Sequence, residues 1–330
     1  MRKKRNYILF IVLTLMLITF VFTDLLFGST HIAFGDFIKT IFGKGNNPIL
    51  QEIIINYRLP KAITAILAGA ALSIAGLLLQ TLFGNPLADP YILGVSSGAS
   101  LGVALVVMAS SILPVAFVQS GWTQIIAAVG GAAVVLLAVI AVSYKVRDVV
   151  SLLIVGIMFG TIAASLITIL QNASNPDILK IFITWTFGSL VVSWSYLLVL
   201  LPVTIIGIIA AFLIKKPLDG MLLGERYAQT MGISVKKMRL LIVVITGILS
   251  GGVTAFTGPI AFVGIAVPHL ARGLFRTSEH RILLSASAIC GAILLLACDI
   301  ITQIPANPLP VNTVSALLGA PIIIWILIKK

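Results

Sequence analysis

The side chains of this chain that could meet a polar partner gather in one polar segment, residues 215–239, which reads KKPLDGMLLGERYAQTMGISVKKMR. It carries six of the 22 basic residues, and Gly220, Gly224 and Gly232 separate short helix-forming pieces. Glycines at such breaks let the backbone take tight turns. The pattern predicts an ordered docking surface for another protein, set between long apolar runs.

No motif in the sequence marks a catalytic site. His31, His269 and His280 are scattered, and neither an HExxH metal motif nor a GxxxxGK[ST] phosphate loop occurs. No nucleophile–base pair stands out, so an intramembrane enzyme or scaffold is the least favoured class. If ATP powers this protein, the ATPase must be another chain.

Composition places the chain among membrane proteins. Its 330 residues are 59% hydrophobic and 10% charged, with a mean hydropathy of +1.16, whereas soluble domains carry about 25% charged residues. The net charge of +12 is typical of basic cytoplasmic loops. Nucleic acid is not an expected partner, because no basic run alternates with aromatic residues.

The apolar runs predict an all-α, polytopic fold with ten transmembrane helices in a single domain over residues 1–330. A hydrocarbon core about 30 Å thick needs roughly 20 helical residues. The eighth run is short and rich in Gly and Pro. The expected spans are 7–27, 60–82, 93–113, 122–143, 149–171, 190–214, 238–256, 260–275, 282–303 and 311–328.

The distribution of basic residues orients these spans. If the N-terminus is inside and the spans alternate, 17 of the 22 basic residues fall on the inner side. The asymmetry predicts that both termini and the polar segment lie in the cytoplasm. On the outer side, surface helices are expected around 36–42 and from Asp177.

A weak internal similarity links the two halves of the chain. Arg58-Leu-Pro-Lys61 opens the second span and Lys236-Lys-Met-Arg239 opens the seventh, at an offset of 178, and Gly69 and Gly247 share that register. The two spans run in opposite directions in the predicted topology. This favours an inverted repeat of spans 2–5 on spans 7–10.

Two segments break the helical pattern at membrane depth. Pro86 and Pro90 interrupt residues 83–99, and Gly258 and Pro259 interrupt the eighth span. Irregular backbone at this depth is tolerated only where it lines a cavity or is buried in protein. We therefore expect 83–99 to line a transport pathway.

The spans contain almost no ionisable residues, with Asp24 and Asp299 near span ends. Intramembrane carboxylates and histidines mark proton and ion relays, so their scarcity counts against a proton- or sodium-driven carrier. Sodium sites built from carbonyls and hydroxyls leave no such signal. A stand-alone secondary transporter of a small solute is therefore the alternative hypothesis.

Motifs spread over nearly the whole chain carry a resemblance to one family. They are Arg58–Lys61, Ala68–Gly76, Gln80, Asn85–Pro90, Leu93–Gly98, Trp185, Gly188–Leu190, Leu223–Glu225, Ala228, Gly232, Gly258–Gly264, Pro268, His269, Arg272 and Leu317–Pro321. Together they resemble the membrane permease subunits of ABC importers for iron-siderophore complexes, haem and vitamin B12, the FecCD family.

The resemblance implies a ten-span permease that forms a homodimer around the transport path. Two ABC ATPase subunits, which hold ATP-Mg, would dock on the polar segment, while this chain binds no cofactor itself. A periplasmic or lipid-anchored substrate-binding protein would deliver the cargo on the outside. The coupling positions that match are Leu223, Gly224, Glu225, Ala228 and Gly232.

The resemblance also implies gates and an outer docking site. Asn85 and Leu87 match one part of a cytoplasmic gate, and Val149 and Val150 fall where the other part would be. Arg58 and Lys61 match basic positions that meet acidic residues of the binding protein. Lys61 stands where relatives often have Arg, which keeps the charge but not the bidentate pairing.

Further departures are Thr302 and Gln303, where many relatives carry an Arg, and Asn312, where Gly is common. They leave a third docking contact unmatched. The sequence as a whole predicts a permease of the bacterial cytoplasmic membrane that works by alternating access. The favoured cargo is a ferric siderophore or haem, with vitamin B12 as a further candidate.

Overall fold

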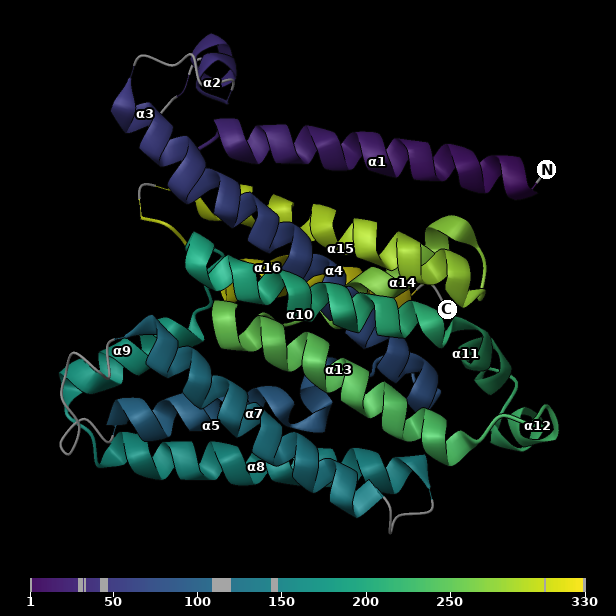
Figure 1. Cartoon of the computed structure of the whole chain (residues 1–330). Helices are drawn as coiled ribbons and strands as arrows, with labels where there is room; N and C mark the ends of the chain where they lie inside the picture. Colours follow the sequence, from purple (N-terminus) through teal and green to yellow (C-terminus); the bar gives the residue numbers. More distant parts are fainter. Residues whose placement is uncertain are drawn as a thin grey trace.

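The computed structural model describes residues 2–28, 32, 34–41, 47–108, 120–143, 148–305 and 307–328. Within these ranges the chain forms a bundle of helices, and the described part contains no strand (Figure 1). Some residues used above lie outside the described residues. They are His31, Phe42, Lys44, Lys145, Arg147, Lys329 and Lys330.

Seven helices in the described part are long and apolar enough to cross a membrane. They lie in α1 (Arg2–Leu26), α4 (Leu59–Phe83), α7 (Gly121–Ser143), α8 (Val149–Asn172), α10 (Trp194–Leu213), α13 (Val235–Thr257) and α15 (His280–Thr302). Shorter apolar helices fill the other expected ranges: α5 (Val95–Met108), α14 (Val263–Phe275) and α16 (Val311–Ile328). The all-helical fold is confirmed, while ten crossings remain a prediction.

The second expected span begins earlier than predicted. The helix α3 (Pro48–Glu52), the π-helical turn η1 (Ile53–Arg58) and α4 form one continuous helix, Pro48–Phe83, so the predicted start at residue 60 is wrong. Pro60 has no N–H to donate to the preceding turn. The wider π turn directly before it lets the helix continue past the proline.

Short helices at the loops follow the sequence pattern. The expected surface helix near 36–42 is α2 (Phe34–Ile41), whose Phe37 is fully buried. The helix expected from Asp177 is α9 (Pro176–Thr186). The broken segment 83–99 forms a turn and the 3-10 helix η2 (Pro90–Leu93) before α5. These predicted helices are confirmed within the described residues.

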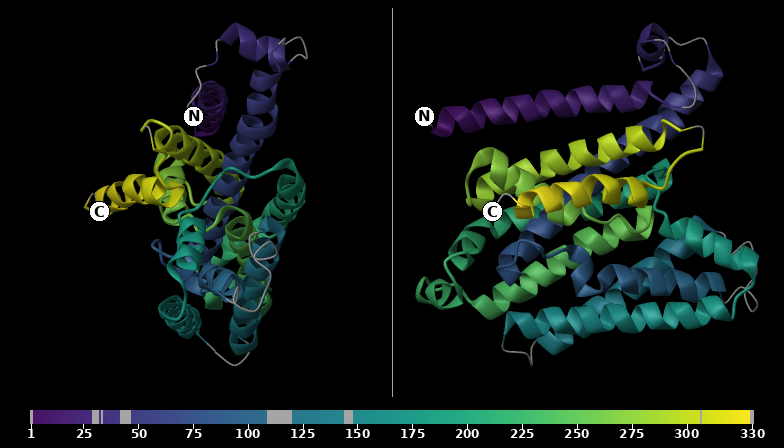
Figure 2. Two further views of the ribbon diagram at one scale, coloured as in Figure 1. Left: turned by 90° about the vertical axis from the view of Figure 1, so that its left-hand side faces the viewer. Right: turned by 180° about the vertical axis from the view of Figure 1, so that it is seen from behind.

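The α4 helix is the centre of the bundle. It crosses the other helices obliquely (Figures 1 and 2) and packs against α13, α14 and α15. Small residues allow this close approach, because a Cβ added at Gly69 would overlap the carbonyl group of Gly291 on α15. Small residues at helix contacts are the usual means of packing helices in a bilayer.

The α7 helix offers a matched pair of adjacent glycines. A Cβ at Gly131 would overlap the carbonyl oxygen of Gly98 on α5, whereas a Cβ at Gly130 meets nothing within 4 Å. We expect Gly131→Val to lower the free energy of unfolding by about 1–3 kcal/mol, the usual penalty for overpacking. Unfolding in mixed micelles measures this. Gly130→Val is the control, and equal destabilisation by both variants would contradict the contact.

The two ends of the bundle differ in what they carry. The helices α11 (Lys215–Met221) and α12 (Glu225–Thr230) lie at the end where α1 begins and α16 finishes (Figures 1 and 2). The helices α2, α3 and α9 lie at the opposite end. We call these the coupling end and the opposite end.

Candidate functional site: a docking surface linked to the membrane helices

The polar segment 215–239 folds into α11, α12 and the first turn of α13. Gly224, with φ +98°, ends the turn after α11, and Gly232, with φ +79°, ends the turn after α12. Left-handed backbone of this kind favours glycine. The two predicted breaks therefore give the segment a fixed, compact shape.

This segment exposes apolar side chains although it is the most polar part of the chain. Leu223, Tyr227 and Met231 are 62%, 53% and 58% exposed, while Ala228 between them is fully buried. Leu223, Gly224 and Glu225 line one surface hollow together with Tyr227. Exposed apolar groups rimmed by charges are typical of protein interaction sites. The predicted coupling residues thus form one continuous surface.

A salt bridge fixes this surface to a membrane helix. The Arg239 guanidinium on α13 lies 3.0 Å from the carboxylate of Glu225 at the start of α12. Arg239 is buried, whereas the side chain of Glu225 is partly exposed. A displacement of α12 is therefore passed directly to α13.

The first predicted gate segment is the turn at residues 84–88, which follows α4. The Leu87 N–H donates to the Asn85 side-chain oxygen at 2.9 Å, and the Ala88 N–H donates to the Asn85 carbonyl. His269 on α14 holds the Pro86 carbonyl oxygen through Nε2 at 2.8 Å. The Leu87 side chain stays exposed. The turn is thus rigid at its base and presents an apolar side chain.

The second predicted gate segment starts α8. Asp148 caps this helix by accepting from the Ser151 N–H at 2.7 Å and the Ser151 hydroxyl at 2.6 Å. These hydrogen bonds hold the pKa of Asp148 below its usual range. Val149 is half-buried and Val150 is exposed. No contact between this segment and Leu87 is needed for either geometry, and the gate roles stay predictions.

Further along the broken segment, Asp89 caps η2. Its carboxylate accepts from the Tyr91 N–H at 2.9 Å. Burial raises the pKa of Asp89 to about 6, against the opposing effect of that hydrogen bond. The side chain therefore sits beside the 84–88 turn as a buried, structural carboxyl group.

At the opposite end, the predicted docking residues lie in a buried ionic cluster. Arg58 and Lys61 are 5% and 7% exposed. Lys61 Nζ lies 2.6 Å from the Asp299 carboxylate and 4.0 Å from Asp24. Arg58 donates to the Leu25 and Leu26 carbonyls, both at 2.8 Å. The pair still lines a hollow of about 380 Å³ at this end.

The departures noted in the sequence belong to the same end of the molecule. Gln303 donates to the Asp299 carboxylate at 2.9 Å and so completes the cluster. The Asn312 side chain accepts from the Ala261 N–H at 3.1 Å, and its own N–H donates to the Phe187 carbonyl. Asn312 therefore ties the start of α16 to the break before α14, which a glycine could not do.

Sequence reasoning missed the role of Asp24. Its carboxylate is fully buried beside Lys61, and the signal was a single acidic residue near the end of an otherwise uncharged run. Asp24 and Asp299 join α1 to α4 and α15, although they are far apart in the chain. Within the described residues, no cluster of three or more His, Cys, Asp or Glu could hold a metal ion.

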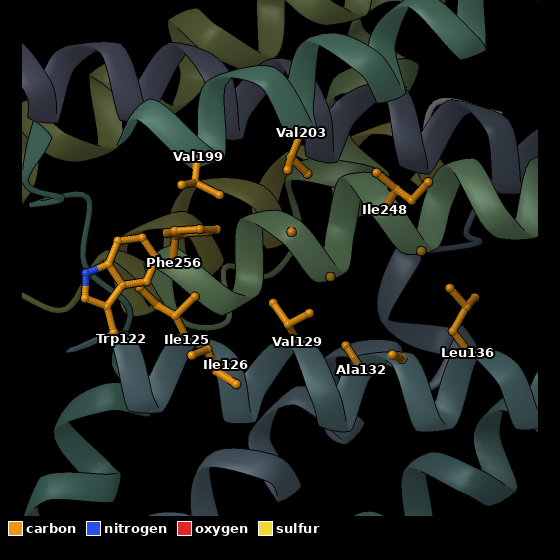
Figure 3. A pocket seen from close by; sticks show the side chains of 14 residues that line it. Trp122, Ile125, Ile126, Val129, Ala132, Leu136, Val199, Val203, Ile248 and Phe256 are labelled. Atoms are coloured by element: carbon orange, nitrogen blue, oxygen red, sulfur yellow. The ribbon is translucent and has the colours of Figure 1, made fainter. Parts of the chain in front are cut away.

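An apolar hollow of about 530 Å³ lies between α7, α10 and α13 (Figure 3). Trp122 and Phe256 close one end, and Gly247 and Gly251 leave space on α13. No charged side chain lines it. It offers no partner to the carboxylate or phosphate groups of a polar solute, so we do not count it as a cargo site.

The long apolar helices, the small-residue packing and the exposed docking surface define a polytopic helical membrane protein. The FecCD transport family profile matches residues 15–329. The chain belongs to the FecCD transport family.

Named relatives share most of the chain. The vitamin B12 import system permease protein BtuC of Vibrio cholerae is 37% identical over 85% of this chain and 84% of its own. The hemin transport system permease protein HmuU of Yersinia pestis is 33% identical over 88% of each. A solved metal-chelate type ABC transporter, in an inward-facing conformation, superposes with a TM-score of 0.86 at 26% identity, covering 97% of this chain and 98% of that one.

Proposed function

We propose that this chain is the membrane permease of an ABC importer that carries a metal chelate across the bacterial cytoplasmic membrane. A ferric siderophore or haem is the favoured cargo, with vitamin B12 as the further candidate. The observation that carries the proposal is the exposed apolar surface of the polar segment. It occurs in a FecCD-family chain whose sequence holds no phosphate loop.

The motor is a separate pair of ABC ATPase subunits. They dock on Leu223, Gly224 and Glu225, with Ala228 and Gly232 shaping the surface beneath. ATP-Mg is held by those subunits, and this chain supplies no cofactor. The Glu225–Arg239 salt bridge supports the coupling role, because it joins the docking surface to α13.

The transport step is alternating access in a homodimer of this chain. ATP-driven approach of the two ATPases displaces α11 and α12, and the displacement shifts the gate segments. Asn85 and Leu87 form one inner gate element, and Val149 and Val150 form the other. The apolar side chains of Leu87 and Val150 suit a gate, because an apolar constriction closes a pore by excluding water.

An inverted repeat underlies this mechanism. The α4 helix packs against α14 and α15, and the α13 helix packs against α5 and α7. The helices α5 and α8 are also in contact, as are α14 and α16. This correspondence supports a repeat in which α13, α5, α7 and α8 match α4, α14, α15 and α16. Such repeats place the transport path at their interface.

A substrate-binding protein docks at the opposite end. Arg58 and Lys61 line a hollow there, and acidic residues of the binding protein compete with Asp299 for Lys61. Because both basic groups are already paired within the chain, docking requires local rearrangement of the cluster. Reversing both charges should weaken docking at low salt, where electrostatic attraction is least screened.

Co-purification tests the ATPase assignment. A tagged permease is isolated with candidate ATPases from neighbouring reading frames, and the stoichiometry of the complex is measured. The proposal predicts two ATPase subunits for each pair of permease chains. A permease that retains no ATPase, yet moves solute down or against an ion gradient, would instead support the stand-alone carrier.

A further inference from the structure

His280 is a buried histidine that joins three helices at the coupling end. It starts α15 and is 1% exposed. Its Nδ1 lies 2.7 Å from the carboxylate of Asp219 on α11, and its Nε2 lies 2.8 Å from the hydroxyl of Thr81 on α4. Both ring nitrogens therefore have a partner on a different helix.

The Asp219 carboxylate makes this link directional. A carboxylate only accepts hydrogen bonds, so it takes the Nδ1 proton of His280. The same oxygen accepts the backbone N–H of His280 at 2.8 Å. It thus also caps the start of α15, where free N–H groups and the helix dipole favour a negative charge. Charge-assisted hydrogen bonds of this kind are strong.

The other end of the link reaches the first gate segment. Thr81 lies in the last turn of α4 and is buried. Its carbonyl oxygen accepts the N–H of Gly84, whose φ of +56° starts the 84–88 turn. A short path of hydrogen bonds therefore runs from α11 in the polar segment, through His280, to the base of the turn that carries Asn85 and Leu87.

This path is separate from the Glu225–Arg239 salt bridge. That bridge joins α12 to α13, whereas the histidine path joins α11 to α15 and α4. On its far side the turn is held by His269 on α14, through Pro86. The turn therefore has one support that moves with the polar segment and one that belongs to the membrane helices.

We propose that Asp219, His280 and Thr81 are positioning residues that pass the displacement of the polar segment to the 84–88 turn. The inference rests on the proposed importer function and adds the route by which the motor moves the gate. Without the path, α11 can move while α4 and its turn remain in place. ATP hydrolysis then continues but opens the gate less often.

The test compares variants of the assembled importer, with its ATPases and binding protein, in proteoliposomes. Thr81→Val removes the hydroxyl at nearly constant volume, and Asp219→Leu removes the acceptor. We expect ATPase binding and hydrolysis to persist while the amount of chelate moved per ATP falls by about tenfold, the effect of losing one strong hydrogen bond. Thr81→Ser, which keeps the hydroxyl, should restore the ratio.

The matched control is Thr64→Val. Thr64 is also a buried threonine of α4, and its hydroxyl donates to Pro60 within the same helix. An unchanged transport-to-ATP ratio in Thr81→Val, or an equal loss in Thr64→Val, would overturn the inference. If Asp219→Leu does not insert, Thr81→Val and Thr81→Ser decide the question. Failure of the importer proposal looks different, because the unaltered chain then shows no ATP-driven uptake.

Discussion

A Leu223→Asp permease is expected to insert normally and to lose its ATPase partner. Leu223 is the most exposed of the apolar side chains on the docking surface, beside Tyr227 and Met231. An unpaired carboxylate buried in an interface costs about 3–5 kcal/mol, so the affinity for the ATPase should fall about 100-fold or more. The dissociation constant of the detergent-solubilised complex measures this, and transport should fall with it.

Two controls accompany this variant. Leu223→Met keeps an apolar side chain and should bind the ATPase normally. Ile49→Asp makes the same kind of change at another exposed apolar residue, in α3 at the opposite end, and should leave ATPase affinity unaltered. Full ATPase affinity in Leu223→Asp would remove the polar segment from the docking site.

Replacement of Lys61 by Met is expected to destabilise the protein strongly. The change leaves the buried carboxylates of Asp24 and Asp299 without the ammonium group that lies 2.6 Å from Asp299. Breaking a buried ion pair by removing one partner costs about 3–5 kcal/mol. The free energy of unfolding in mixed micelles should fall by that amount.

The ionic cluster also supplies the controls for this variant. Adding Asp299→Asn to Lys61→Met removes one of the stranded charges and should recover part of the lost stability. Lys180→Met removes an exposed lysine of α9 at the same end and should change stability by no more than about 0.5 kcal/mol. A Lys61→Met protein as stable as Lys180→Met would contradict the buried cluster.

The membrane helices could be predicted from sequence because they depend on local composition. Apolar length located the expected spans, and Gly258 with Pro259 located the break before α14. The start of the second span was missed, since Pro60 looked like a helix boundary. The π turn Ile53–Arg58 removes the need for that proline's N–H, and no composition rule signals such a turn.

The site divides in the same way. The docking surface was predictable, because its polar residues and glycines are contiguous in the chain. The paths that leave it were not. Asp219, His280 and Thr81 are separated by long stretches of sequence and meet only after the helices pack. Lys61 and Arg58 were identified by type, but their burial against Asp24 and Asp299 depends on the position of α1 and α15.

Uptake into proteoliposomes tests the central claim most directly. Vesicles contain the purified permease with or without its ATPase subunits, and chelate-loaded binding protein is supplied on the side of the opposite end. The importer mechanism predicts accumulation of chelate only when the ATPases and ATP-Mg are both present. Accumulation by the permease alone, driven by an ion gradient, would contradict it.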